Sequence, residues 1–110
     1  MLSIYLSMVE TEEEKDLVTE LYNTYKQILF NVSMSILHNT ADAEDAVQET
    51  FVRIISNLSK IDCANEKRSK AYIFVVTRNI CYDILRKKHK LVFIDDDKEL
   101  VDTNAVENTE

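Results

Sequence analysis

The sequence predicts an all-α protein: a compact bundle of three long helices, the first of which can be kinked or split. Two observations predict this fold. The 110 residues include no glycine and no proline, the residues that usually punctuate strands, hairpins and phosphate-binding loops. Apolar residues also recur at three- and four-residue steps in three successive segments, which is the period of a helix with one buried face. The lack of glycine further excludes the glycine-dependent nucleotide-binding motifs.

The first predicted helix begins near Thr11 and runs to about Leu37. Thr11 can cap a first turn that is rich in glutamate, and negative charge stabilises a helix N-terminus. The residues expected to face inward are Leu17, Leu21, Tyr25, Ile28, Val32 and Ile36. Residues 1–10 are set apart as an N-terminal extension.

The second predicted helix starts at a break in the pattern, where Asn39 or Thr40 can act as the cap. Its inward stripe is expected to contain Val47, Phe51, Ile54, Ile55 and Leu58. The remaining positions lie on the flanking or outer surface, and they include Asp45, Gln48, Glu49 and Val52. We therefore expect an acidic, amide-rich surface on this helix.

A polar connection from residue 57 to about residue 68 leads into the third predicted helix, which runs to about Lys90. Ile73, Val76, Ile80 and Ile84 form its inward stripe. Residues 93–110 are acidic and poor in apolar side chains, which is typical of a linker or disordered tail. Residues 11–92 are accordingly expected to form the folded domain.

The net charge of −7 conceals a strongly basic segment. Residues 65–90 carry eight basic and two acidic side chains. A local field of this kind can attract phosphates even in an acidic chain, because it acts over about one Debye length. The candidate phosphate contacts are Lys67, Arg68, Lys70, Arg78, Arg86, Lys87, Lys88 and Lys90. The alternative is that the charges at the helix end only complement the helix dipole.

Nothing in the composition points to a metal, a cofactor or catalysis. The two cysteines, Cys63 and Cys81, and the two histidines, His38 and His89, show none of the close spacings that metal sites use. The histidines have no evident nucleophile as a partner. No apolar run approaches the roughly 18 residues of a membrane span, and the first residues lack the basic flank of a secretion signal. We therefore expect a cytoplasmic protein with reduced thiols and no membrane insertion.

Two motifs resemble region 2 of the extracytoplasmic-function (ECF) group of bacterial RNA polymerase sigma factors, in the sigma-70 family. Ala43-Glu44-Asp45-Ala46-Val47-Gln48-Glu49-Thr50-Phe51 is similar to the AED-x-x-Q-E-x-F signature of that group. The segment from Tyr72 to Arg86 resembles its W-L-x-x-I-A-R-N…D-x-x-R signature. Both motifs occur in the expected order and at about the expected separation.

The resemblance implies that the second helix binds core RNA polymerase, at the basic clamp helices of the largest subunit. Asp45, Gln48 and Glu49 carry that contact by position, with Glu44 and Arg53 as neighbours. Charge complementarity of this kind guides orientation and association rate. The alternative is that the acidic run is only a helix cap with a solvated face.

The resemblance also implies that the third helix and the loop before it recognise the non-template strand of the promoter minus-ten element and help to open it. Residues 61–68, beginning with Ile61, would form a pocket for an extracted base, and Asn79 would contact a base edge. Tyr72, at the position of the family's tryptophan, could stack on an unpaired base, as could Phe74. The alternatives are a packing role for Asn79 and a core position for at least one of the two aromatic residues.

The chain departs from the family in lacking tryptophan and in ending where an acidic linker would begin. Family members continue into a second domain, region 4, that reads the minus-thirty-five element. We therefore expect no region 4 domain here, so the chain is an isolated domain of a longer protein or a truncated member. The competing function is a helical protein-interaction regulator that never touches DNA. A duplex-binding helix-turn-helix protein is disfavoured, because no short two-helix unit is evident. The family resemblance also admits an anti-sigma factor as a partner.

Overall fold

The computed structural model describes residues 1–61 and 64–95, and the side chains of residues 1–61 and 64–90. Its elements are α1 (Leu2–Leu6), α2 (Glu12–Leu37), α3 (Thr40–Ser56), a short 3₁₀ helix (Leu58–Lys60) and α4 (Glu66–Asp95). The described residues include no strand, and the prediction of an all-α fold with three long helices is confirmed. Cys63 and the predicted tail beyond residue 95 lie outside the described residues.

Local hydrogen bonds explain where α2 begins. The Thr11 hydroxyl accepts from the backbone N–H of Glu14 at 3.1 Å, and the Glu14 carboxylate accepts from the backbone N–H of Thr11 at 3.3 Å. This reciprocal capping box satisfies two backbone donors that the helix itself leaves without partners.

A tight connection joins α2 to α3. His38 adopts the left-handed conformation, with φ of 54°, and its N–H donates to the carbonyl of Met34 at 2.9 Å. Asn39 follows in an extended conformation, and its side chain accepts from the N–H of Asp42 at 2.9 Å. The chain thus reverses within two residues, and α3 returns along α2.

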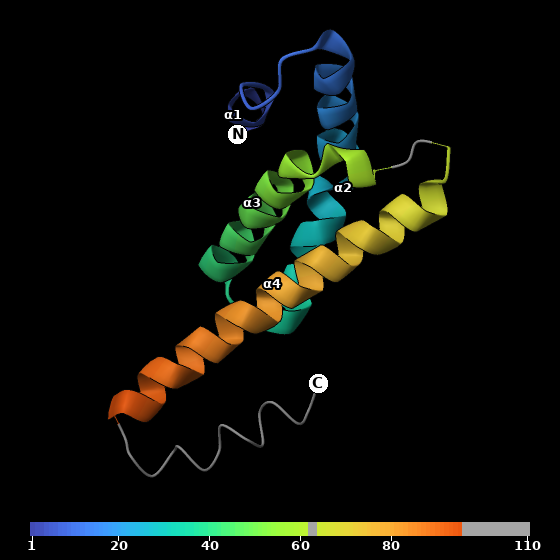
Figure 1. Ribbon diagram of the computed structural model, residues 1–110. Coiled ribbons are helices and arrows are strands. Elements are labelled where there is room, and N and C mark those ends of the chain that lie inside the picture. Colours follow the sequence, from blue (N-terminus) through green and yellow to red (C-terminus); the bar gives the residue numbers. More distant parts are fainter. Residues whose placement is uncertain (62–63, 96–110) are drawn as a thin grey trace.

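The three long helices pack into one bundle, in which α4 crosses both α2 and α3 and its last turns extend past them (Figure 1). The larger core cluster joins all four α-helices through the buried residues Tyr5, Val18, Leu21, Tyr25, Leu29, Phe51, Ile54, Ile55 and Ile73. A second cluster, towards the C-terminal end of α2, contains Leu37, Ala46, Val76, Ile80 and Cys81. Buried Thr50 and Thr77 donate to the carbonyls of Ala46 and Ile73, so their hydroxyls are satisfied.

The short helix α1 was not predicted from the sequence. It packs on α2 and α3 through Tyr5, which is 2% exposed. The Tyr5 ring lies 5.5 Å from the ring of Phe51 and 5.9 Å from that of Tyr22, measured between centroids. Five residues offer too little periodicity to be recognised as a helix, but three aromatic rings in contact are enough to hold the segment on the bundle.

Three details of the prediction are wrong. The inward stripe of α2 was expected to include Ile28, which is 41% exposed, whereas Leu29 beside it is fully buried. The third helix begins at Glu66 rather than near residue 68, because the side chain of Asn65 accepts from the N–H of Arg68 and caps it there. It also continues to Asp95 rather than ending near Lys90, since no glycine or proline interrupts it.

Candidate functional site

The predicted polymerase contacts all lie on the outer side of α3. Because Ala43, Ala46 and Thr50 face the core, the positions between them point to solvent, apart from half-buried Val47. Each of the five side chains is exposed, and together we call them the α3 surface: Glu44, Asp45, Gln48, Glu49 and Arg53. The structure therefore brings together the residues that the first motif singled out.

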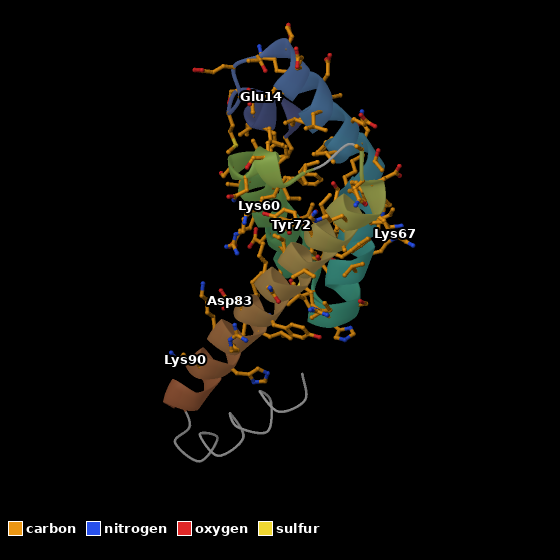
Figure 2. All side chains as sticks on the ribbon, turned by 45° about the vertical axis from the view of Figure 1, so that its right-hand side comes forward. Glu14, Lys60, Lys67, Tyr72, Asp83 and Lys90 are labelled. Carbon is orange, nitrogen blue, oxygen red and sulfur yellow. The ribbon has the colours of Figure 1, made fainter. Side chains whose placement is uncertain are left out.

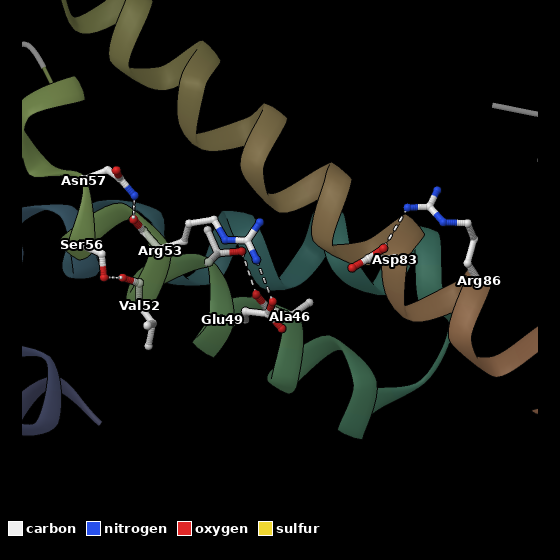
Figure 3. A network of polar contacts seen from close by, with 9 residues as sticks. Ala46, Glu49, Val52, Arg53, Ser56, Asn57, Asp83 and Arg86 are labelled. Carbon is white, nitrogen blue, oxygen red and sulfur yellow. Dashed lines mark hydrogen bonds and ion pairs between the residues drawn. The ribbon is translucent and has the colours of Figure 1, made fainter.

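The charges on the α3 surface are not equally available. Arg53 and Glu49 form an ion pair of 3.0 Å, one helical turn apart, and both side chains are about half exposed (Figure 3). Within the described part of the chain, Glu44 and Asp45 make no ion pair. A basic partner would therefore meet two unpaired carboxylates near the start of α3 and a neutralised pair further along it.

A shallow groove runs between α3 and α4 beside this surface. It is lined by Asp45, Gln48, Glu49, Val52 and Ile84. Val52 is 42% exposed, and Ile84, which reaches the groove from α4, is half-buried. The motif pointed to the three polar residues but not to the two apolar ones, because the groove forms only when α4 packs on α3. We call it the α3–α4 groove.

The predicted DNA contacts are spread around α4 rather than gathered on one side. Arg68, Tyr72, Asn79 and Arg86 recur at four- and seven-residue steps and therefore share one face, which we call the α4 stripe. Lys67 and Arg78 are eleven residues apart and share another face. The charged residues and Asn79 are exposed, whereas Tyr72 is half-buried and packs against both core clusters, near the middle of the bundle in Figure 2. The expectation that one aromatic residue contributes to the core is thus met by Tyr72 and by Phe74, which packs against the larger cluster.

Several of the predicted phosphate contacts have partners within the domain. The ammonium of Lys88 lies 2.5 Å from the carboxylate of Asp42 at the start of α3. Arg86 pairs with Asp83 at 2.8 Å (Figure 3), and the Lys70 ammonium lies 6.0 Å from the centre of the Phe74 ring. Lys87 is exposed about two turns before the end of α4, and Lys90 lies further along the helix (Figure 2).

Ile61 follows the 3₁₀ helix and packs, half-buried, against the larger core cluster. It lines a small hollow with residues of α2 and the first turn of α4: Leu17, Glu20, Leu21, Thr24, Tyr25, Glu66 and Ser69. Burial raises the pKa of Tyr25, and the carboxylates of Glu66 and Glu20 add to the shift. The loop expected to hold a base, residues 61–68, includes residues 62 and 63, which lie outside the described residues.

Metal and membrane sites were also sought. In residues 1–61 and 64–90, no three residues of the His, Cys, Asp and Glu types are placed to hold a metal ion. No helix within the described residues is long and apolar enough to cross a membrane. Cys81 is a buried thiol, and burial raises its pKa, with the Ser33 hydroxyl opposing the shift.

Comparisons with known proteins agree with the two motifs. Residues 21–91 match the model of the Sigma-70 region 2 family. The ECF RNA polymerase sigma factor SigM of Bacillus subtilis (strain 168) is 32% identical over 80 residues, which is 73% of this chain and 47% of SigM. SigW, also an ECF RNA polymerase sigma factor of that organism, is 24% identical over 74% of this chain and 43% of its own. The RNA polymerase sigma factor SigV, again from B. subtilis, is 26% identical over 82% of this chain and 53% of SigV. The chain thus spans about half the length of the curated relatives it matches, and no solved structure matches it.

Proposed function

The chain belongs to the Sigma-70 region 2 family, as a region 2 domain of the ECF type, and we propose that it acts in transcription initiation by binding core RNA polymerase and the promoter minus-ten element. In this role it is an initiation factor and not an enzyme. The polymerase it serves is cytoplasmic. Residues 11–92 would be the functional domain, and residues 93–110 an acidic connecting segment.

The observation that carries the proposal is the placement of two different chemistries on neighbouring helices of one bundle. The α3 surface offers carboxylates and an amide to a basic protein helix. The α4 stripe offers guanidinium groups, an amide and an aromatic ring to a polyanion with unpaired bases. A factor that joins polymerase to DNA needs both.

On the polymerase side, the partner would be the clamp helices of the largest subunit. Glu44 and Asp45 would contribute most of the attraction because neither is neutralised within the described residues, whereas Glu49 shares its charge with Arg53. An anti-sigma protein that covered this surface would compete with polymerase.

On the DNA side, Asn79 would contact a base edge of the non-template strand, since its amide supplies both a donor and an acceptor. The half-buried Tyr72 would offer one ring edge or face to a base. The basic side chains of α4 would contact phosphates, and Ile61 would border the pocket for an extracted base. The domain would help to open the minus-ten element because it would bind the unpaired strand more tightly than the duplex.

A second candidate function is a helical interaction module that binds a protein partner without DNA. The pairing of Lys88 with Asp42 and of Arg86 with Asp83 supports it, because both cations are partly neutralised. The two functions differ in one measurement. Fluorescence anisotropy with a preopened promoter, with and without core polymerase, should show polymerase-dependent binding for a sigma domain and none for the alternative.

The polymerase contact is tested by reversing charge on the α3 surface. The double variant Asp45→Lys with Glu49→Lys should lose binding to core polymerase while its helical circular dichroism is unchanged, because exposed substitutions shift stability by only about 0.5 kcal/mol. The control is Glu13→Lys with Asp16→Lys, which makes the same charge change at exposed positions of α2. Equal binding by the two double variants would reject the polymerase contact on α3.

A further inference from the structure

The α3–α4 groove contains two apolar side chains that the polymerase motif does not explain. Val52 is 42% exposed and belongs to neither core cluster. It lies three residues after Glu49, four after Gln48 and seven after Asp45, so all four share one side of α3. A partner that contacts the three polar side chains must therefore also cover Val52.

Ile84 completes the apolar floor from the neighbouring helix. It is half-buried, packs against the second core cluster and still lines the groove with Val52. Its position depends on the packing of α4 against α3, so the floor exists only in the folded bundle. The groove thus has the anatomy of a small interface, with an apolar centre and a polar rim.

We propose that Val52 and Ile84 form the seat for an apolar side chain of a basic helix in core polymerase, so that the docking surface spans both α3 and α4. This rests on the proposed binding of polymerase to the α3 surface. The occupant is a helix that places one apolar residue between lysine or arginine side chains, the apolar residue in the groove and the cations against Asp45 and Glu44.

The charges around the groove favour that occupant. Asp45 lines the groove and Glu44 is its neighbour in sequence, and both carboxylates lack an ion pair in the described part of the chain. The cation Arg53 on α3 is paired with Glu49 at 3.0 Å, which reduces its repulsion of a basic helix (Figure 3). The surface is therefore acidic where a cation would approach and apolar where a methyl or methylene group would be buried.

The polar rim and the apolar floor should affect binding in different ways. Charges at the rim steer the encounter and are screened by salt. An apolar contact mainly slows dissociation and depends little on salt. The two contributions can therefore be separated by measuring association and dissociation rates at several salt concentrations.

The test compares two valines of equal exposure in binding of the full chain to core polymerase without DNA. Val52 and Val75 are 42% and 43% exposed, and Val75, on α4, does not line the groove. Val52→Ser should weaken binding roughly tenfold, as expected for loss of a buried valine contact, with a faster dissociation rate and an unchanged salt dependence. Val75→Ser should bind as the unchanged chain does.

Two outcomes would overturn the proposal: equal affinity of Val52→Ser and Val75→Ser, or a loss in Val52→Ser that disappears at high salt. Thermal melting of both variants checks that each remains folded. The charge-reversal variant of Asp45 and Glu49 is measured in parallel. If it loses binding while Val52→Ser does not, the apolar seat is rejected and the polymerase contact on α3 stands. If charge reversal has no effect, the proposed function itself is rejected.

Discussion

At the scale of single residues, the most unusual backbone position in the described part of the chain is His38. It ends α2 in the left-handed conformation, with φ of 54°, where a side chain with a Cβ atom is disfavoured. Helices usually place glycine at such a position, but this chain has none. His38 therefore stores local strain at the tightest connection of the bundle.

His38→Gly should raise the free energy of unfolding by about 0.5 to 1 kcal/mol, because relief of the left-handed strain outweighs the greater freedom of glycine in the unfolded chain. Chemical denaturation monitored by circular dichroism measures the change. His89→Gly, within α4, is the contrasting variant and should lower stability by a similar amount. A loss of stability in His38→Gly would show that the imidazole makes a compensating contact.

Asn79 is the residue on which base recognition depends in the proposed function. It is exposed on the α4 stripe, so its amide is accessible to a ligand. Asn79→Ala should lose about 1 to 3 kcal/mol of binding to the preferred promoter strand and reduce discrimination at one base position. Competition binding with strands that differ at each position measures this. Uniform losses on all strands would indicate instead that Asn79 acts through packing.

At the scale of elements, the sequence predicted the three long helices well because their caps and periodic faces are local signals. The register of α2 was harder. Ile28 and Leu29 are both apolar, and only the helices packed around α2 decide that Leu29 is buried. The buried positions of α2 advance mostly by four residues, since its neighbours change from α1 to α4 along its length. Sequence periodicity holds no information about that change of partner.

For the candidate site too, the sequence predicted what lies on one helix but not what tertiary packing brings together. The α3 surface follows from one helical motif, and its five residues are exposed as the motif indicates. Val52 and Ile84 come together only through tertiary packing, so no spacing in the sequence could pair them. The ion pair between Lys88 and Asp42 joins residues 46 positions apart and was likewise beyond a local pattern.

The short helix α1 gives one prediction at this scale. Tyr5→Ala should lower stability by about 1 to 2 kcal/mol, less than a typical buried aromatic residue, because five residues can detach without opening the bundle. Ile4→Ala, at a position 58% exposed, should change stability by less than about 0.5 kcal/mol. Urea titration of both variants tests the difference, and equal effects would mean that α1 does not stabilise the bundle in solution.

The basic residues Arg86, Lys87 and Lys88 of α4 give another prediction at this scale. Replacing Arg86, Lys87 and Lys88 with alanine would reduce the slope of log affinity against log salt by about 2 if all three released counterions from a single strand, at roughly 0.7 each. Because Arg86 and Lys88 are already paired with Asp83 and Asp42, we expect a reduction nearer 0.7. The salt series is measured on a preopened promoter with core polymerase. An unchanged slope would mean that none of the three residues contacts a phosphate.

At the scale of the whole molecule, the burial of two tyrosines and one cysteine makes stability depend on pH in the alkaline range. The pKa values of Tyr5, Tyr25 and Cys81 are all raised, chiefly by burial, above ordinary values of 10.0, 10.0 and 9.0. The unfolded chain therefore releases these protons at a lower pH than the folded one. Stability is level with respect to these groups below about pH 9 and falls as the pH rises beyond it.

Thermal melting between about pH 7.5 and 10.5 should show this decline. The variant Tyr5→Phe with Tyr25→Phe keeps both rings in the core but removes two of the three protons. It should therefore melt with a shallower dependence on pH in the upper part of that range. If the double variant and the unchanged chain show the same dependence of melting on pH, groups other than these tyrosines cause the loss of stability at alkaline pH.

The uninterrupted length of α4 fixes how two partners can approach the domain. Asn79 and Ile84 are five residues apart on one helix, which places them about 7.5 Å apart along its axis and about 140° apart around it. A ligand at Asn79 and a ligand in the α3–α4 groove thus occupy nearly opposite sides of a single rod and need not collide. The helix has no glycine or proline at which to bend, so it fixes the angle around its axis between the two bound ligands. One residue inserted between Asn79 and Ile84 would change that angle by about 100° without altering either contact surface.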